Sequence, residues 1–339
     1  MSPNSQAERM IGESASFLQV QEQISRLAPL NKPVLIIGER GTGKELVAAR
    51  LHYLSRRWDQ EFLKLNCAAF NEGLLESQLF GHESGAFTGA TRQQKGYFER
   101  ADDGTLFLDE VANTSMSVQE KLLRVTEYGE IERLGGTRPL QVDVRLVAAT
   151  NIDLPRLAAA GKFREDLLDR LAFAVITLPP LRERREDIPV LAHHFAISMV
   201  KELERDYFPG FSKSATQALL DYDWPGNIRE LKNVVERCVY QSEDPEQPVK
   251  DVVFDPFASP WRPTTKVTVA SGSSTPQAPT LGKNGFKQQV QDYETQLLRE
   301  ALRQSQFNQR KAAKLLDLTY DQFRGYLRKY ALLTGKGGE

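Results

Sequence analysis

Five short apolar runs recur between longer segments of helical periodicity in the first half of the chain. They read PVLIIGE (33–39), FLKLNC (62–67), GTLFLDE (104–110), VRLVAATN (144–151) and FAVITLP (173–179). Apolar runs of this length, separated by helix-length segments, are typical of βαβ units. They predict an α/β domain with a parallel sheet that helices cover on both faces.

The pattern changes after residue 180. Residues 182 to about 250 have helical periodicity and no convincing strand, which predicts a small helical subdomain. The stretch that follows is rich in Pro, Ser, Thr and Gly and predicts a flexible linker, and helix-forming sequence comes after it. We therefore expect an α/β subdomain (1–180), a helical lid (181–255), a linker (256–285) and an all-α C-terminal domain (286–339).

Composition narrows the class of protein. The chain has 339 residues, 40% of them hydrophobic and 26% charged, as expected for a globular protein of two or three domains. Two cysteines without CxxC spacing suggest neither a disulfide framework nor a zinc site. No apolar run is long enough to span a bilayer, and the N-terminus lacks a signal-peptide core. We expect a cytoplasmic protein without direct membrane insertion.

The segment GERGTGKE (38–45) follows the first apolar run directly and precedes a helical pattern. It fits G-x-x-x-x-G-K, in which backbone N–H groups cradle phosphates and the lysine reaches the terminal ones. A glycine turn with a surface lysine is the alternative, but a strand before and a helix after favour nucleotide binding. Glu45 departs from the general motif, which has Ser or Thr there to bind Mg²⁺. The candidate ATP-binding residues are Gly38, Glu39, Arg40, Gly41, Thr42, Gly43, Lys44 and Glu45.

Polar residues end several of the predicted strands, and ligands bind at the carboxyl ends of parallel strands. Asp109 is placed to hold Mg²⁺ through water, and Glu110 to orient or deprotonate the attacking water. A solvated acidic turn is the alternative, which the apolar run before it disfavours. Asn151 ends another strand, where it is a candidate sensor of the γ-phosphate. Asn66 fits a turn cap as well as a catalytic partner.

The hexapeptide GAFTGA consists of Gly85, Ala86, Phe87, Thr88, Gly89 and Ala90. Glycines at both ends predict a loop, and a lone aromatic at a loop tip indicates contact with another molecule. The alternative is that Phe87 is a core residue.

The C-terminal segments NQRKAAKLLDL and TYDQFRGYLRKY predict a helix-turn-helix whose second helix begins with Thr319 as N-cap. Six Lys or Arg and two Asp lie between 306 and 330, whereas the whole chain has a net charge of -1. This local basic patch favours binding of double-stranded DNA over a simple packing role. The expected base or phosphate contacts are Thr319, Tyr320, Asp321, Gln322, Arg324 and Arg328.

A spaced set of motifs resembles the AAA+ domain of the σ54-dependent transcriptional activators, the bacterial enhancer-binding proteins. The set comprises GERGTGKE, ESQLFGHESGAFTGA, GTLFLDE, FREDLLDRL, PPLRERREDI and WPGNIREL, and the match covers roughly residues 10 to 245. GAFTGA beside the Walker motifs is very specific to this family, whose P-loop also has Glu at the position of Glu45. The C-terminal segment resembles the family's Fis-type domain.

The resemblance implies an ATPase that uses ATP and Mg²⁺, assembles into a ring, expected to be hexameric, and remodels RNA polymerase carrying σ54 from upstream DNA. GAFTGA would contact σ54. A hairpin around Gly135 and Gly136 would support that loop. Two rival functions stay open. One is an AAA+ motor that acts on DNA itself, which has no need for GAFTGA. The other is a non-enzymatic DNA-binding regulator, against which the intact Lys44, Asp109 and Glu110 count.

Roles for individual residues also follow from the resemblance. Arg164 and Arg170 match arginines that reach the ATP site of the neighbouring subunit, although arginines in a charged helix are usually solvated. Arg229 matches the lid arginine that faces the nucleotide, with Asn227 placed to cap its helix. Asn66 matches the residue that pairs with Glu110 and couples phosphate status to loop movement.

Only about ten residues precede IGESASF, where the family typically has a regulatory domain of more than a hundred. This organisation resembles the branch of the family that activates phage-shock genes. Trp58 has charged neighbours that favour a surface position, and it fits a partner anchor or a cap on the core. By the resemblance, the partner would be the inhibitor phage shock protein A.

Overall fold

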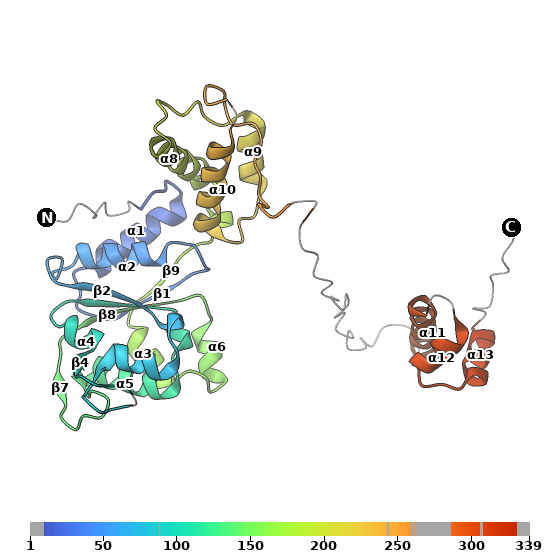
Figure 1. Cartoon of the computed structure of the whole chain (residues 1–339), viewed down its shortest axis with the longest axis horizontal. Coiled ribbons are helices and arrows are strands. Elements are labelled where there is room, and N and C mark those ends of the chain that lie inside the picture. Colours follow the sequence, from blue (N-terminus) through green and yellow to red (C-terminus); the bar gives the residue numbers. More distant parts are fainter. Residues whose placement is uncertain are drawn as a thin grey trace. The chain divides into compact units, whose positions relative to one another are not determined.

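The computed structural model describes residues 10–87, 89–242, 244–258, 261, 286–305 and 308–330. Two compact units divide the chain, Met1–Ala258 and Ser259–Glu339, and each has a hydrophobic core of its own (Figure 1). Thr88 and most of the expected linker lie outside the described residues.

A five-stranded parallel sheet forms the centre of the first unit. The strands are β1 (Val34–Ile37), β2 (Phe62–Asn66), β5 (Thr105–Asp109), β8 (Arg145–Thr150) and β9 (Val175–Thr177). Their order is β2-β5-β8-β1-β9, with every neighbouring pair parallel. Each predicted apolar run is thus confirmed as a strand, slightly shorter than its run.

Both faces of this sheet are covered, as the sequence predicts. Alternate side chains of one strand enter two different cores: Val34 and Ile36 of β1 lie in one, and Leu35 lies in the other. Helices α1 (Ala15–Leu27) and α2 (Lys44–Tyr53) contribute to the first core. The second core is shared by α3 (Glu72–Phe80), α4 (Tyr97–Arg100), α5 (Met116–Tyr128), α6 (Leu154–Ala159) and α7 (Glu165–Leu171) (Figure 1).

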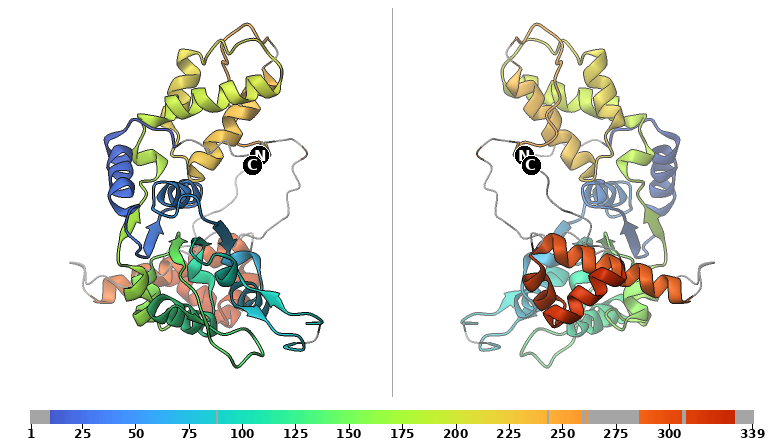
Figure 2. Two further views of the ribbon diagram at one scale, coloured as in Figure 1. Left: turned by 90° about the vertical axis from the view of Figure 1, so that its left-hand side faces the viewer. Right: turned by 90° about the vertical axis from the view of Figure 1, so that its right-hand side faces the viewer.

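Two short antiparallel hairpins interrupt the α/β pattern. One pairs β3 (Gly81–His82) with β4 (Gln94–Lys95) and carries the GAFTGA segment. The other pairs β6 (Glu130–Ile131) with β7 (Leu140–Gln141), which confirms the hairpin predicted around Gly135. The β3–β4 hairpin projects from the body of the domain in Figure 2. The hairpins meet where Glu83 N donates to Leu134 O at 3.0 Å and Leu134 N donates to Gly81 O at 3.0 Å.

Three helices build the lid: α8 (Asp187–Glu202), α9 (Lys213–Asp221) and α10 (Asn227–Gln241). They pack around the fully buried Trp224, in a core separate from those of the sheet. The chain before α1 is tied to this lid, because the buried Asp187 carboxylate accepts hydrogen bonds from Glu13 N, Ser14 N and Ser14 Oγ at 2.6–2.8 Å.

The described helices of the second unit are α11 (Phe286–Gln304), α12 (Gln309–Leu315) and α13 (Tyr320–Lys329). Ala312 and Ala313 are buried in its core, where small side chains let the helices approach. Thr319 caps α13 in a reciprocal capping box with Gln322, which confirms the predicted N-cap. Among the described helices of the chain, none has the length and apolarity needed to cross a membrane.

Candidate functional site

The segment GERGTGKE forms the turn between β1 and α2. Gly41 and Gly43 both have positive φ, +78° and +95°, a conformation that L-residues with a side chain rarely adopt. The buried Lys44 donates from Nζ to the carbonyl oxygens of Gly38 at 3.0 Å and Glu39 at 3.3 Å. The lysine therefore lies across its own loop, at the N-terminus of a helix where phosphates bind.

The lid packs directly on this turn. A Cβ built on Gly41 would lie 2.2 Å from Gly226 O, just before α10, and 3.1 Å from Cβ of Arg229. Ile228 N donates to Gly41 O at 3.0 Å. Only glycine fits at 41, because the first turn of α10 lies against it.

Glu39 joins the turn to the lid through charge. Arg182, in the short 3-10 helix η3 (Leu181–Glu183), donates to its two carboxylate oxygens at 2.6 and 2.9 Å. Asn227 Nδ2 donates to Glu39 Oε2 at 3.1 Å. These hydrogen bonds, led by those of Arg182, lower the pKa of Glu39 from 4.5 to about 2.

Asn227 does not cap α10, and that prediction is wrong. The N-cap is Gly226, which forms no side-chain cap. Asn227 is fully buried, with φ of +53°, and its amide joins separate segments: Nδ2 also donates to Arg40 O at 3.0 Å, and Oδ1 accepts from Leu181 N at 2.8 Å. The amide is used to join the lid to the phosphate loop, so it is not available to the helix N-terminus.

The acidic end of the site follows β5. Glu110 has φ of +56°, a left-handed conformation that is unusual for a side chain of this size and is often found at functional sites. With its amide in the orientation that suits its neighbours, Asn151 donates to Glu110 Oε2 at 2.7 Å and accepts from Arg40 Nε at 3.2 Å. Asp109 Oδ1 accepts from Glu110 N at 3.0 Å.

Electrostatics connect these groups to Lys44. Burial lowers the pKa of the Lys44 ammonium, the Asp109 and Glu110 carboxylates oppose that shift, and the Arg229 and Arg40 guanidinium groups add to it. The strand end, the phosphate loop and the lid thus converge on one site. Lys44 therefore lies among groups of both charges, and the Asp109 and Glu110 carboxylates supply oxygen ligands of the kind that Mg²⁺ prefers.

Two predicted members of the site have other partners in this structure. Asn66 accepts a hydrogen bond at Oδ1 from Ala68 N at 2.8 Å, which caps the short 3-10 helix η1 (Cys67–Ala69). It lies opposite Asp109 in the strand register. Glu45 forms an ion pair with Lys64, at 2.7 Å. Glu110 is paired with Asn151, and Asn66 acts as a turn cap.

Arg170 lies on α7 and Arg164 is the N-cap residue just before it, and each pairs with a carboxylate of its own chain. Arg164 donates to both carboxylate oxygens of Asp166, at 2.7 and 3.0 Å. Arg170 Nη2 donates to Glu127 on α5 at 2.5 Å. Neither arginine joins the cluster around Lys44 in this single chain.

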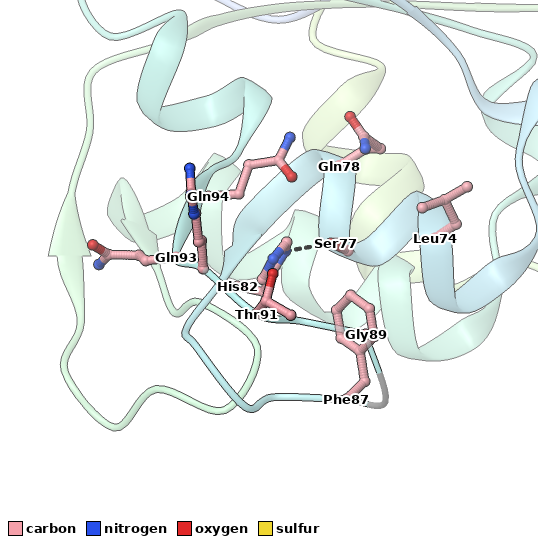
Figure 3. Close-up of a pocket in the computed structure, with 10 residues that line it drawn as sticks. Leu74, Ser77, Gln78, His82, Phe87, Gly89, Thr91, Gln93 and Gln94 are labelled. Atoms are coloured by element: carbon pink, nitrogen blue, oxygen red, sulfur yellow. Dashed lines mark hydrogen bonds between the residues drawn. The ribbon is translucent and has the colours of Figure 1, made fainter.

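The GAFTGA segment forms the tip of the β3–β4 hairpin, and Phe87 is 44% exposed, so it is not a core residue. The Phe87 ring meets the His82 ring edge to face, with centroids 5.0 Å apart. His82 Nδ1 and Ser77 Oγ are hydrogen-bonded at 2.8 Å (Figure 3). From the second hairpin, a Cβ on Gly135 would lie 2.9 Å from Cβ of Ala86, so the two loops touch.

Sequence reasoning missed the roles of Arg182, His82 and Ser77. Arg182 stands in the motif PPLRERREDI, where several arginines look alike, and only the docked lid shows which one reaches Glu39. His82 is five residues from Phe87, a spacing that carries no helical or strand signal.

Among the predicted DNA contacts, Tyr320, Asp321, Gln322, Arg324 and Arg328 are all exposed on α13. Gln322 Oε1 accepts from Thr319 N at 3.0 Å, so these two side chains also serve the helix cap. Trp58 is 61% exposed, so it is not a core residue.

Three family models match successive parts of the chain. The sigma-54 interaction domain covers residues 10–177, the AAA+ ATPase lid domain covers 182–256, and the Fis family of bacterial regulatory proteins covers 289–330. Relatives include the Psp operon transcriptional activator of Escherichia coli K12, 58% identical over 325 residues, which are 96% of this chain and 98% of that protein. The Nif-specific regulatory protein of Azotobacter vinelandii is 44% identical, over 91% of this chain and 56% of its own length.

Solved structures agree with these matches. NtrX from Brucella abortus in complex with ADP is 30% identical with a TM-score of 0.68, over 96% of this chain and 70% of that one. The complex of NtrX with ATP has a TM-score of 0.67, again at 30% identity, over 95% and 70% of the two chains. With an AAA+ domain that carries GAFTGA, a helical lid and a Fis-type helix-turn-helix, the chain belongs to the σ54-dependent transcriptional activators.

Proposed function

We propose that this protein hydrolyses ATP and uses the energy to remodel the closed complex of RNA polymerase with σ54 into the open complex. The observation that carries the proposal is the convergence of Lys44, Glu110 and Arg229 on one phosphate loop, on the same domain that exposes Phe87. A phosphate site and an exposed contact loop on one domain are the parts that a chemical motor needs.

The phosphate loop fits ATP by its shape and charge. Its glycines leave room for phosphate oxygens at the N-terminus of α2, and a triphosphate would draw Lys44 Nζ from the carbonyl oxygens of Gly38 and Glu39. Arg229 approaches from the lid, on the side where the nucleotide would lie. Bound ATP would therefore contact both the lid and the sheet domain.

Hydrolysis requires an activated water near the strand end. Glu110, which follows β5 with a left-handed backbone, is the general base or the residue that orients this water. Asp109 would hold Mg²⁺ through water, and the metal when bound neutralises charge on the phosphate oxygens. Asn151 restrains Glu110 through its 2.7 Å hydrogen bond until a γ-phosphate changes the arrangement.

The active form is a homo-oligomeric ring, which we propose to be a hexamer. Arg164, at the N-cap of α7, and Arg170, within it, are not among the charged groups around Lys44, and a neighbouring subunit would receive them at its γ-phosphate. Their present partners, Asp166 and Glu127, are exposed or half-buried carboxylates. Exposed ion pairs are weak, so exchange for a phosphate costs little.

The helix-turn-helix unit would bring the ring to double-stranded DNA upstream of the promoter. Arg324 and Arg328 are exposed on α13, the helix placed to enter the major groove. The similarity to the Psp operon transcriptional activator supports phage-shock genes as targets. We also propose that phage shock protein A is an inhibitor that docks on Trp58, whose side chain is exposed.

In vitro transcription from a σ54 promoter tests the proposal. Wild-type protein should form open complexes with ATP and fail to do so with a non-hydrolysable analogue. Glu110→Gln should bind ATP and yield no open complex, whereas the surface variant Glu61→Gln should match the wild type. Open complexes that form without hydrolysis would overturn the motor assignment, and ATP-dependent unwinding of DNA without polymerase would favour a motor that acts on DNA itself.

A further inference from the structure

A pocket of about 370 Å³ lies between α3 and the β3–β4 hairpin, at the base of the GAFTGA loop. Leu74, Ser77 and Gln78 line it from α3, and the hairpin contributes His82, Phe87 and residues between Gly89 and Gln94. Figure 3 shows the Phe87 ring pointing from the loop toward α3. The only large aromatic ring that lines this pocket thus comes from the loop itself.

His82 meets that ring with a fixed geometry. The two rings lie edge to face at an interplanar angle of 66°, an arrangement that is favourable for aromatic pairs. Ser77 Oγ holds the imidazole at Nδ1 from α3, and both side chains are more than nine-tenths buried. A buried hydrogen bond to a neighbouring helix therefore sets the orientation of the surface on which Phe87 rests.

The GAFTGA loop is closed by its own backbone hydrogen bonds and has glycines near both ends. Gly85 N donates to Ala90 O at 2.7 Å, and Ala90 N donates to Phe87 O at 3.0 Å. Gly85 and Gly89 have positive φ, and nothing lies within 4 Å of a Cβ at either position. The tip is thus free of close packing around its glycines, and the contact of Phe87 with the pocket holds it down on the α3 side.

We propose that this pocket is the seat of Phe87 when the loop is retracted, and that His82, oriented by Ser77, is a positioning residue that holds the loop in this state. The inference rests on the proposed function in one respect, namely that the raised loop contacts σ54. In the seat, the ring contacts His82, so σ54 would compete with His82 for the apolar surface of Phe87. The seat would keep the resting ring from binding σ54 before nucleotide raises the loop.

Chymotrypsin measures seating without σ54, because it cleaves after accessible Phe in mobile chain segments. The rate of cleavage after Phe87 would be compared with that after Phe257, which is 68% exposed and far along the chain, as an internal standard. Ser77→Ala and His82→Ala should raise the ratio of the two rates about three- to tenfold, the range expected from losing one aromatic contact. Ser198→Ala, which removes a hydroxyl bonded within α8, should leave it unchanged.

Leu74→Ala is a further variant that spares the buried pair, because Leu74 is 43% exposed and removing its side chain leaves the fold intact. It should raise cleavage after Phe87 by a smaller factor. Melting curves identify a variant that has unfolded, and if His82→Ala unfolds, Ser77→Ala and Leu74→Ala carry the test. An unchanged cleavage ratio in folded Ser77→Ala and Leu74→Ala would overturn the seat.

A second arm measures capture of σ54 without nucleotide. The folded variants should retain ATPase activity and capture more σ54 than the wild type, which should need a transition-state analogue such as ADP with aluminium fluoride. If cleavage rises but no protein captures σ54 under any condition, the seat stands and the proposed function fails. If wild type captures σ54 with the analogue while cleavage is unchanged in the variants, the proposed function stands and the seat fails.

Discussion

Two glycine-rich loops of the same domain use glycine for opposite purposes. In the phosphate loop, a Cβ on Gly41 would lie 2.2 Å from Gly226 O, so glycine allows two backbones to touch. In the GAFTGA loop, nothing lies within 4 Å of a Cβ on Gly85 or Gly89, so glycine allows the backbone to turn and move. The glycines of the first loop are closely packed, and those of the second are not.

The anchors of the two loops differ in the same way. Lys44 and Glu39 fix the phosphate loop through hydrogen bonds to its own carbonyls and to Arg182 of the lid. Phe87 rests on His82 through one aromatic contact. Binding phosphate needs donors in fixed positions, whereas pushing on a partner needs a contact that can be released, and the two kinds of anchor suit the functions proposed for the two loops.

The largest expected effects are on ATP binding and ATP hydrolysis, which should depend on different residues of the phosphate loop and of the neighbouring strand end. Lys44→Ala should lose ATP binding, because no other residue of the loop carries an ammonium to the phosphates. Glu110→Ala should still bind ATP and turn over about 10²- to 10⁴-fold more slowly, the usual range for loss of a general base. Calorimetric titration with ATP and steady-state hydrolysis measure the two effects. Equal loss of ATP binding in both variants would refute these roles.

A matched glycine pair tests the contrast directly. Gly41→Ala should abolish ATP binding and lower stability by about 3 kcal/mol or more, because it adds backbone strain to a backbone clash. Gly89 has φ of +105°, but a Cβ at this position would meet no neighbour. Gly89→Ala should therefore cost only about 1 kcal/mol of backbone strain and retain ATP binding. Melting curves and ATP titration are the measurements. The comparison fails if Gly89→Ala loses ATP binding or Gly41→Ala keeps it.

Phe87→Ala should affect coupling more than folding. Because Phe87 is 44% exposed, its removal should cost well under the about 3–5 kcal/mol of a core phenylalanine and leave ATPase activity nearly unchanged. Open-complex formation and capture of σ54 with the transition-state analogue should be lost. Unfolding measured beside hydrolysis checks this, and a Phe87→Ala protein that hydrolyses ATP and still captures σ54 contradicts it.

The smallest expected effect is on the stability of the folded state at low pH. Because the pKa of Glu39 is lowered from 4.5 to about 2, its pairing with Arg182 stabilises the folded state fully above pH 4.5 and is lost as the pH falls toward 2. Glu39→Gln lacks this contribution, so wild type should lose more stability than Glu39→Gln between pH 5 and pH 3. The pair is partly exposed, so the difference should stay below about 1 kcal/mol. Identical pH dependence of the two melting temperatures would show that the ion pair is not coupled to folding.

A feature could be predicted from the sequence when the residues that form it lie close together along the chain. The strands and the phosphate loop were predicted because each depends on a short contiguous pattern, such as LVAAT in β8, which is buried on both faces. The pairing of Glu39 with Arg182 could not be, because it joins residues 143 positions apart and exists only when the lid docks. Asn227 was misjudged for the same reason, since a local cap motif competes there with three long-range hydrogen bonds.

The strand order also sets a length scale. β1, which leads into the phosphate loop, and β5, which ends in Asp109, are both neighbours of β8 and lie on opposite sides of it. Two strand spacings therefore separate the end of β1 from the end of β5, about 9.6 Å, twice the ~4.8 Å between strands. Asn151 directly follows β8, the strand between them, and so lies between these two strand ends. Sheet hydrogen bonding alone thus sets the distance between the strand end from which the phosphate loop starts and the strand end that carries Asp109.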